Sequence, residues 1–219
     1  MDVNTLLDYL PLFAQAAVLT IGIAAMGVAC SLVIGLLGAI YLYFRTPVLR
    51  QFFAVYIEVS RNTPLVVQLF FLYYALPKLG LVLSSAVCAI TGLAFLGGGY
   101  MAEAWRSGLE AVPPLQFRSA LSLGFKPIAA LRHVALPQAM ARAAPALTAN
   151  TVFLIKETSV VSVVALPDLV FVAKDLIGAS YNTSEALTLL VLFYLLILLP
   201  VALAAAALER KLRHGEFGT

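Results

Sequence analysis

The stretch SALSLGFKPIAALRHVALPQA, residues 119–139, is a long polar interruption in a chain that is otherwise strongly apolar. Gly124, Pro127 and Pro137 divide it into short pieces. Glycine favours the end of a helix and proline its first turn. We therefore expect one amphipathic helix over 115–123 that ends at Gly124, and a second over 127–136 that Pro137 closes.

The composition predicts a membrane protein. Of the 219 residues, 62% are hydrophobic and 11% are charged, with a mean hydropathy of +0.98; a soluble domain carries about 25% charged residues. Alternation of apolar and polar residues, the mark of a membrane β-barrel, does not occur. We expect an all-α bundle in which residues 1–219 form one transmembrane domain. Apolar runs of about 20 residues, enough to cross the hydrocarbon core, predict five spans, at about 12–44, 52–76, 81–104, 143–166 and 186–208.

The distribution of positive charge predicts the orientation. If the N-terminus lies outside, the long loop 106–142 between spans three and four is cytoplasmic. Eleven of the fourteen Lys and Arg residues then fall on the inner side, so the positive-inside rule predicts that the C-terminus is cytoplasmic too. These residues are Arg45, Arg50, Arg61, Arg106, Arg118, Lys126, Arg132, Arg142, Arg210, Lys211 and Arg213. Two short helices in this loop would form a docking surface or, alternatively, an interfacial anchor for the bundle.

The spacing within the opening stretch resembles the EAA loop of ABC importer permeases, EAA-x3-G-x9-I-x-LP. Two positions depart from it: Arg118 stands where the family has Glu, and Ser119 where it has Ala. In that family the loop forms a coupling helix that seats in a groove of a cytoplasmic ATPase. The resemblance implies that residues 114–137 couple this chain to an ATPase, through Arg118, Ser119, Ala120, Gly124, Phe125, Leu136 and Pro137.

Three further segments resemble signatures of the polar amino acid permeases within that family. SRNTPLVVQLFFLYYALP (60–77) is similar to R-G-T-P-L-x-x-Q-L-F-x-x-Y-x-x-LP. GGYMAEAWRSGLEAVPPLQ (98–116) is similar to G-A-Y-x-A-E-x-x-R-G-G-I-x-A-V-P-x-G-Q, and IKETSVVSVVALPDL (155–169) to K-D-T-S-L-x-S-x-x-x-x-P-E-L. The resemblance implies the five-span fold of a type I importer permease in a bacterial cytoplasmic membrane.

The same resemblance implies the partners. These are a second permease chain, identical or similar, an ATPase dimer, an extracytoplasmic amino acid binding protein and a polar amino acid as substrate, with no nucleic acid. No lysine of this chain follows a glycine, so it has no Walker A loop. ATP and Mg would bind to the partner ATPase, and we expect no cofactor or catalytic site here. His133 and His214 are too isolated to predict a metal site.

Ionisable and polar residues within predicted spans are candidates for the substrate path, because they are costly in a membrane. Asn150 and Glu157 are seven residues apart and share a helix face within about 20°. Glu157 suits the ammonium group of an amino acid and Asn150 its hydrogen-bonding groups. Lys156 is the third candidate, although Lys156 and Glu157 could instead form a structural ion pair. Gln68 is the fourth, with a helix–helix hydrogen bond as its alternative role.

Charged residues also occur near the predicted inner boundary. Glu103 precedes Arg106 by three residues, so the two side chains are helical neighbours that can neutralise each other. Together with Arg61 they form either a structural ion-pair group or an inner gate.

Two other functions compete with an ATP-driven permease. A secondary transporter usually contains two internal repeats, and five unequal spans do not supply them. A non-transporting membrane anchor could use residues 114–137 to recruit a cytoplasmic partner, but it would have no need of Asn150 and Glu157 on one buried face.

Overall fold

The computed structural model describes residues 3–44 and 47–217, and side chains over 4–44 and 47–211. Arg45, Arg213 and His214, named above for their charge or ligand chemistry, fall outside the described side chains. All regular structure in the described part is helical. Its elements are α1 (Val3–Tyr43), α2 (Pro47–Asn62), α3 (Leu65–Phe70), η1 (Phe71–Ala75), η2 (Leu76–Leu79), α4 (Ser85–Glu110), α5 (Pro114–Ser122), α6 (Pro127–Ala130), η3 (Leu131–Ala135), α7 (Leu136–Glu157), η4 (Thr158–Val164), α8 (Leu169–Ser180) and α9 (Thr183–Phe217).

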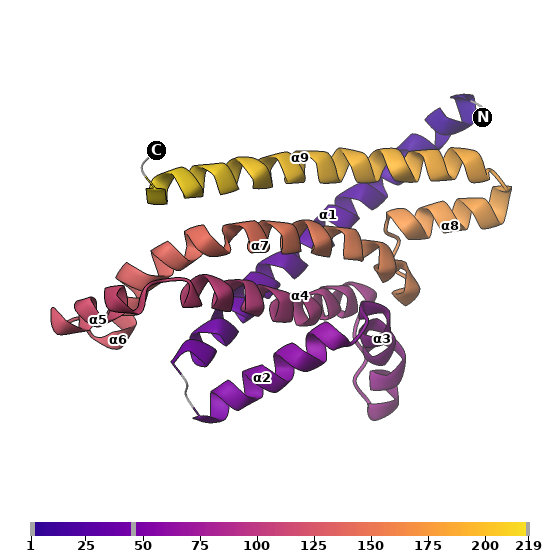
Figure 1. Cartoon of the computed structure of the whole chain (residues 1–219). Helices are drawn as coiled ribbons and strands as arrows, with labels where there is room; N and C mark the ends of the chain where they lie inside the picture. The colour runs from indigo at the N-terminus through magenta and orange to yellow at the C-terminus, as the bar shows by residue number, and fades with distance from the viewer. Residues whose placement is uncertain (1–2, 45–46, 218–219) are drawn as a thin grey trace.

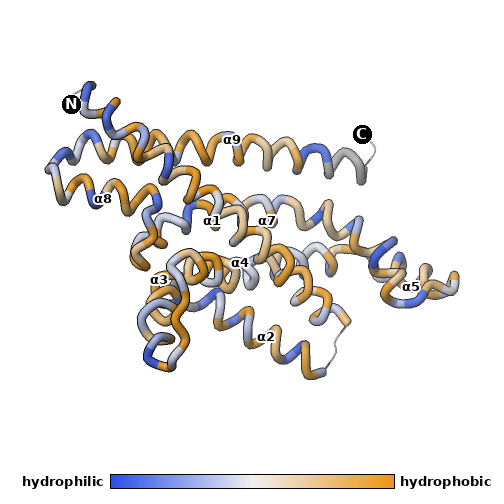
Figure 2. Tube along the Cα trace, turned by 180° about the vertical axis from the view of Figure 1, so that it is seen from behind, coloured by the Kyte–Doolittle hydropathy of each residue, from blue (hydrophilic) through white to orange (hydrophobic). Residues whose placement is uncertain are grey.

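Helix α4 is the centre of the bundle (Figure 1). It lies between α2 and α7, while α9 follows the far side of α7 and α1 crosses behind the layer. Seen from behind, α1 lies in front of the other helices and is apolar over most of its length (Figure 2). α1 therefore covers one face of α2, α4 and α7, and no other described helix covers the opposite face.

Three consecutive glycines let α4 approach three helices closely. A Cβ atom at Gly97 would lie 2.5 Å from Cδ1 of Leu154 in α7, and one at Gly98 would lie 2.8 Å from Cγ2 of Ile34 in α1. At Gly99 the nearest side chains come from α2. In lipid, apolar contact does not by itself drive helices together, so close packing at small residues is what joins them.

The second expected span, 52–76, is not one helix. The chain changes direction at Pro64, which has no N–H for the helical ladder. The side-chain amide of Gln68 donates hydrogen bonds to the backbone carbonyls of Ser60, at 3.2 Å, and Thr63, at 3.0 Å. The amide thus replaces backbone donors lost at the break. The sequence predicts one span because apolar residues continue through both helices, and hydropathy carries no information about the direction of the chain.

Pro137 does not close the second short helix, contrary to the sequence-based expectation. A continuous helix runs from Pro127 to Val164 through η3 and α7. In the π turn of η3, the N–H of Leu136 bonds to the carbonyl of Leu131, five residues back. A π turn is wider than an α-helical turn, and this one makes room for the ring of Pro137.

A π turn also precedes Pro77. The π turn of η1 ends with a hydrogen bond from the N–H of Leu76 to the carbonyl of Phe71, and Pro77 follows. The tripeptide Ala-Leu-Pro occurs at both places, at 75–77 and 135–137. At these two places the proline follows a widened turn, although after Pro77 the helical path continues only to Leu79. At the third Ala-Leu-Pro, 165–167, the tripeptide follows the end of η4.

Helix α8 is an element that the sequence analysis did not predict. Asp168 caps its N-terminus, where one carboxylate oxygen accepts a hydrogen bond from the N–H of Phe171 at 3.0 Å. Burial raises the pKa of the Asp168 carboxyl to about 6. The folded state therefore holds this proton more tightly than the unfolded chain, and the contribution of Asp168 to stability falls as the pH rises through 6.

By length and composition, four helices of the described part could cross a membrane: Asn4–Phe44, Ser85–Glu110, Pro127–Val164 and Thr183–Lys211. They overlap the expected spans at 12–44, 81–104, 143–166 and 186–208, with shifted ends. Leu65–Leu79 is a shorter apolar helical segment. The connection between α4 and the helix that begins at Pro127 consists of residues 111–126. It is shorter than the expected loop, 106–142, because both helices extend into that range.

Gly35 of α1 provides a test of the close packing. A Cβ there would lie 2.8 Å from the backbone nitrogen of Ala102, which cannot move aside as a side chain can. We expect Gly35→Ala to lower the free energy of unfolding by about 1–3 kcal/mol, the usual range for overpacking. The measurement is thermal unfolding of the detergent-solubilised protein.

Gly22→Ala is the matched control, because it lies in the same helix and a Cβ there meets nothing within 4 Å. It should leave stability unchanged or raise it by up to about 1 kcal/mol through helix propensity. Equal melting temperatures for the two variants would contradict the close-packing interpretation.

Candidate functional site

Tyr100 of α4 contacts residues from two other helices, α2 and α7. The guanidinium of Arg61, in α2, lies over its ring, with Cζ 5.3 Å from the ring centroid. The ring of Phe153, in α7, packs against it at a centroid distance of 5.3 Å. The side-chain amide of Asn150 donates a hydrogen bond to the Tyr100 carbonyl at 3.1 Å. Tyr100 therefore contacts both Asn150, a candidate for the substrate path, and Arg61, one of the charged residues expected near the inner boundary.

Sequence reasoning did not select Tyr100. The available signal was its position three residues before Glu103, which puts both side chains on one face of a helix. The triple glycine that precedes Tyr100 was a second signal, because it predicts that other helices approach closely at this point.

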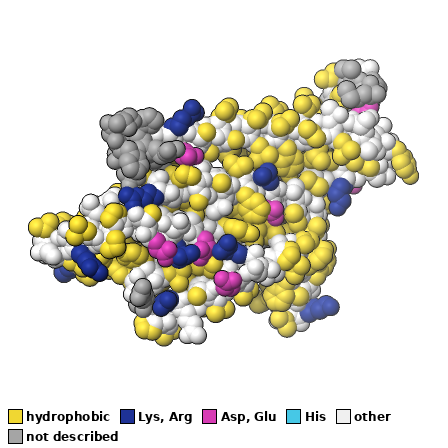
Figure 3. All heavy atoms as spheres, in the orientation of Figure 1, with side chains coloured by type: hydrophobic (Ala, Val, Ile, Leu, Met, Phe, Trp, Pro, Cys, Tyr) yellow, Lys and Arg dark blue, Asp and Glu magenta, His cyan; other side chains and the backbone are white. Residues whose placement is uncertain are grey.

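Acidic and basic side chains alternate in a row on the face of the molecule that Figure 3 shows. Arg106 bonds to Glu103 one turn before it, at 2.6 and 3.2 Å, and to Glu110 one turn after it, at 2.8 and 2.9 Å. Arg61 approaches Glu103 at 3.9 Å. The structure thus brings together all three residues expected at the inner boundary.

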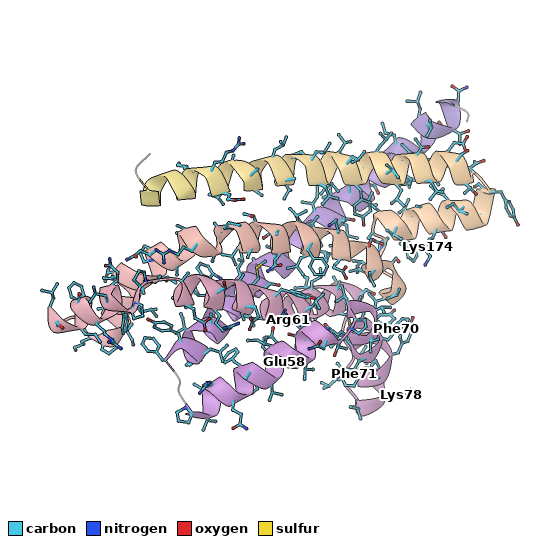
Figure 4. All side chains as sticks on the ribbon, in the orientation of Figure 1. Glu58, Arg61, Phe70, Phe71, Lys78 and Lys174 are labelled. Atoms are coloured by element: carbon cyan, nitrogen blue, oxygen red, sulfur yellow. The ribbon has the colours of Figure 1, made fainter. Side chains whose placement is uncertain are left out.

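Arg61 lies deeper in the bundle than the sequence analysis suggested. It is level with Tyr100 rather than with the end of α4. Tyr100 is ten residues from Glu110, which corresponds to about 15 Å along the axis. Figure 4 shows Arg61 where α2 passes α4, one turn from Glu58. An arginine at this depth is costly in a membrane and therefore a candidate for function.

Helix α7 presents Asn150, Phe153 and Glu157 at spacings that keep them on one side of the helix. Glu157 is half-buried and, within the described part of the chain, makes no ion pair within 4 Å. Lys156 is exposed beside it. At the end of α7, Glu157 thus offers a carboxylate that bonds to no other described side chain.

Gln68 lies elsewhere and directs its hydrogen bonds to the break in the second span, not to Asn150 or Glu157. It also lines a groove of about 380 Å³ between α2, α3 and α4, together with Thr63, Thr91 and Phe95. Its side-chain oxygen is buried without a hydrogen-bond partner among the described residues. The groove is otherwise almost entirely apolar.

The expected coupling residues form the tip of the molecule at α5 and α6 (Figure 1). As the sequence predicted, α5 ends at Gly124, whose φ is +89°. The N–H of Phe125 bonds to the carbonyl of Ala120, and the N–H of Gly124 to that of Leu121. This pair of bonds is a Schellman motif, which requires the left-handed conformation that glycine adopts readily.

Most of the tip is exposed. Arg118, Ser119, Gly124, Phe125 and Pro137 are exposed, whereas Ala120 is buried and Leu136 half-buried. Large apolar side chains join them on the surface: Leu115 is 73% exposed, Leu123 80% and Ile128 74%. Exposed apolar side chains in such number are typical of a site that contacts another protein or the membrane surface.

The base of the tip is fixed to the bundle. Phe117 of α5 makes edge-on ring contacts with Tyr43 and Phe44 at the end of α1. Arg142 of α7 donates a hydrogen bond to the carbonyl of Ala111, which follows α4. The exposed tip is therefore held by α1, α4 and α7 together.

Residues 31–214 match the sequence profile of the family described as the binding-protein-dependent transport system inner membrane component. The chain belongs to this family. Membership of this permease family implies a substrate-binding protein and an ATPase as partners, and the apolar helices agree with a multi-pass membrane protein.

Similar permeases extend over nearly the whole chain. The probable glutamine ABC transporter permease protein GlnP of Bacillus subtilis is 32% identical over 205 residues, covering 92% of this chain and 94% of the relative. The glutamine transport system permease protein GlnP of Escherichia coli K12 is 30% identical, covering 97% and 98%. The arginine transport system permease protein ArtQ of B. subtilis is 29% identical, covering 99% of both.

Solved structures share the permease fold. A crystal structure of an amino acid ABC transporter with histidines superposes with a TM-score of 0.87 at 29% identity, over 96% of this chain and 99% of that one. The inward-facing MetNI methionine ABC transporter has a TM-score of 0.80 at 19% identity, which supports the fold alone.

Gln68→Leu tests the role of the side-chain amide at the break. Removing two hydrogen bonds to otherwise free carbonyls should lower stability by about 1–3 kcal/mol. Thermal unfolding in detergent measures the effect, and Gln51→Leu, at an exposed position of α2, is the control. If the two variants melt together, Gln68 does not stabilise the break.

Proposed function

We propose that this permease is the transmembrane subunit of an ATP-driven importer for polar amino acids in a bacterial cytoplasmic membrane. The observation that carries the proposal is the exposed tip at α5 and α6, with Leu115, Leu123 and Ile128 on its surface. An exposed apolar tip that also carries basic side chains has the chemistry of a seat for a cytoplasmic protein. The names of the relatives supply the substrate class.

The proposed topology has five crossings, with the N-terminus outside and the C-terminus in the cytoplasm. Four crossings are the long apolar helices, and the fifth is α2 continued by α3, η1 and η2. The basic side chains of the tip, among them Arg118, Lys126 and Arg132, support a cytoplasmic position.

The proposed substrate path follows the face that α1 leaves uncovered. Glu157 would attract the ammonium group of an amino acid, and Asn150 would offer its amide oxygen. Gln68, whose amide N–H groups are bonded at the break, would offer its side-chain oxygen from the neighbouring groove. Lys156 would lie at the edge of the path. Because α1 does not cover this face, a second permease chain, identical or similar, would close the path from the other side.

The energy source belongs to other chains in this proposal. An ATPase dimer would bind ATP and Mg and would seat on residues 114–137, and an extracytoplasmic binding protein would deliver the amino acid. Arg118 is exposed at the seat where the family pattern has Glu. We therefore propose that the ATPase of this system carries an acidic or neutral side chain opposite Arg118.

Gly124→Trp tests the coupling surface. The substitution strains the turn at φ +89° and adds a large ring to the exposed tip. We expect a loss of at least about tenfold in co-purified ATPase, because the misplaced tip loses its contacts, while the amount of permease in the membrane stays the same.

Gly80→Trp is the matched control, because Gly80 has a φ of +85°, is also free of neighbours and lies at the other connection, after η2. It should retain the ATPase. Equal ATPase recovery with both variants would refute the docking claim.

The transport reaction itself is tested in vesicles that contain the permease, the ATPase and the binding protein, with a panel of amino acids. We expect uptake to require ATP and to fall at least about tenfold in Glu157→Ala, as when a charged hydrogen bond is lost. Asp175→Ala, at an exposed acidic position of α8, should transport normally.

Two outcomes would change the assignment. Uptake that survives removal of the ATPase but stops when the ion gradient is dissipated would indicate a secondary transporter. Full uptake and stimulated ATP hydrolysis by Glu157→Ala would refute the proposed role of Glu157.

A further inference from the structure

Arg61 has hydrogen-bonding capacity that the protein does not use. Its contacts within the described part are the ring of Tyr100 and one Glu103 carboxylate oxygen at 3.9 Å, beyond hydrogen-bond distance. A guanidinium group has five N–H donors in a fixed planar fork. The side chain is 38% exposed, so these donors are accessible.

Glu103 does not need Arg61 as its partner. Arg106 already engages both oxygens of Glu103, at 2.6 and 3.2 Å. A second carboxylate, Glu110, occupies the remaining side of Arg106. Arg61 therefore attracts the Glu103 carboxylate through its charge but makes no hydrogen bond to it.

The position of Arg61 is set by contacts that leave its donors free. The guanidinium lies over the Tyr100 ring with Cζ 5.3 Å from the centroid, a cation–π distance that requires no hydrogen bond from its N–H groups. Tyr100 in turn packs on Phe153, and Glu157 follows Phe153 by one turn. The cationic side chain of Arg61 thus contacts this aromatic pair from α2, and Glu157 lies one helical turn beyond the pair on α7.

We infer that Arg61 binds the carboxylate group of the transported amino acid. The inference rests on the proposed function and assigns a residue to one end of the substrate. A planar carboxylate matches the guanidinium fork with two parallel hydrogen bonds, whereas a carboxamide supplies only one acceptor atom. Every amino acid carries this group, so the contact selects the substrate class and leaves the side chain to other residues.

Arg61→Gln tests the inference through selectivity rather than activity alone. The permease–ATPase complex in lipid nanodiscs, without the binding protein, is given tritiated L-glutamine or L-arginine. Unlabelled amino acid and its carboxamide then compete for binding. We expect the wild type to prefer the free carboxylate by about 10- to 100-fold, the range for hydrogen bonds between charged groups, and Arg61→Gln to lose that preference.

Two further variants separate binding from structure. Arg61→Lys keeps the charge but loses the fork, so its preference should fall between those of the wild type and Arg61→Gln. Arg50→Gln, at an exposed position of the same helix, should keep the wild-type ratio. The ratio compares two ligands on one preparation, so a lower yield of a variant does not alter it.

The outcomes distinguish this inference from the proposed function. If the complete wild-type system takes up no amino acid, the proposed function is wrong. If it does but its nanodisc complex shows no preference for the carboxylate, or if Arg61→Gln or Arg61→Lys keeps the wild-type ratio, Arg61 does not bind that group. Loss of the preference in Arg61→Gln with retention in Arg50→Gln supports the inference.

Discussion

The bundle depends on the close approach of helices at positions of α4 that have no side chain. Gly97, Gly98 and Gly99 meet α1, α2 and α7 within one turn, and Gly108 lies against the carbonyl of Ala139 near the start of α7. Apolar side chains gain little by leaving lipid for a helix interface, because lipid tails are as apolar as leucine. Close van der Waals contact is therefore what favours the assembled helices over separated ones. The side chains just beyond the glycine run, including Tyr100 and Glu103, are thereby fixed against their neighbours.

Prolines shape the helical path in two ways, and in each a glutamine side chain bonds to a nearby carbonyl. At Pro64 the path breaks, and the amide of Gln68 bonds to carbonyls near the end of α2. At Pro137 the path continues through a π turn, and the amide of Gln138 bonds to the carbonyl of Val134 at 3.0 Å. In a membrane an unpaired carbonyl costs several kcal/mol, so the Gln68 amide offsets part of the disruption at Pro64.

These details separate what the sequence could predict from what it could not. Hydropathy located the long helices, and Gly124 predicted the end of α5, because both signals are local and strong. The break at Pro64 and the continuation at Pro137 depend on how neighbouring groups satisfy the backbone, so two prolines led to opposite outcomes. Among the site residues, the spacing of Glu103 and Arg106 predicted their pairing. The contact of Arg61 with Tyr100 joins different helices, and no pattern along one segment encodes it.

The continuous helix from Pro127 to Val164 has a mechanical consequence. Its 38 residues correspond to about 57 Å at the α-helical rise. One end belongs to the exposed tip and the other carries Glu157, with the contact between Gly108 and Ala139 partway along. Contacts with α4 at Ala139, Asn150 and Leu154 hold this helix along its length, so a displacement of the tip is transmitted to α4 as well as toward Glu157.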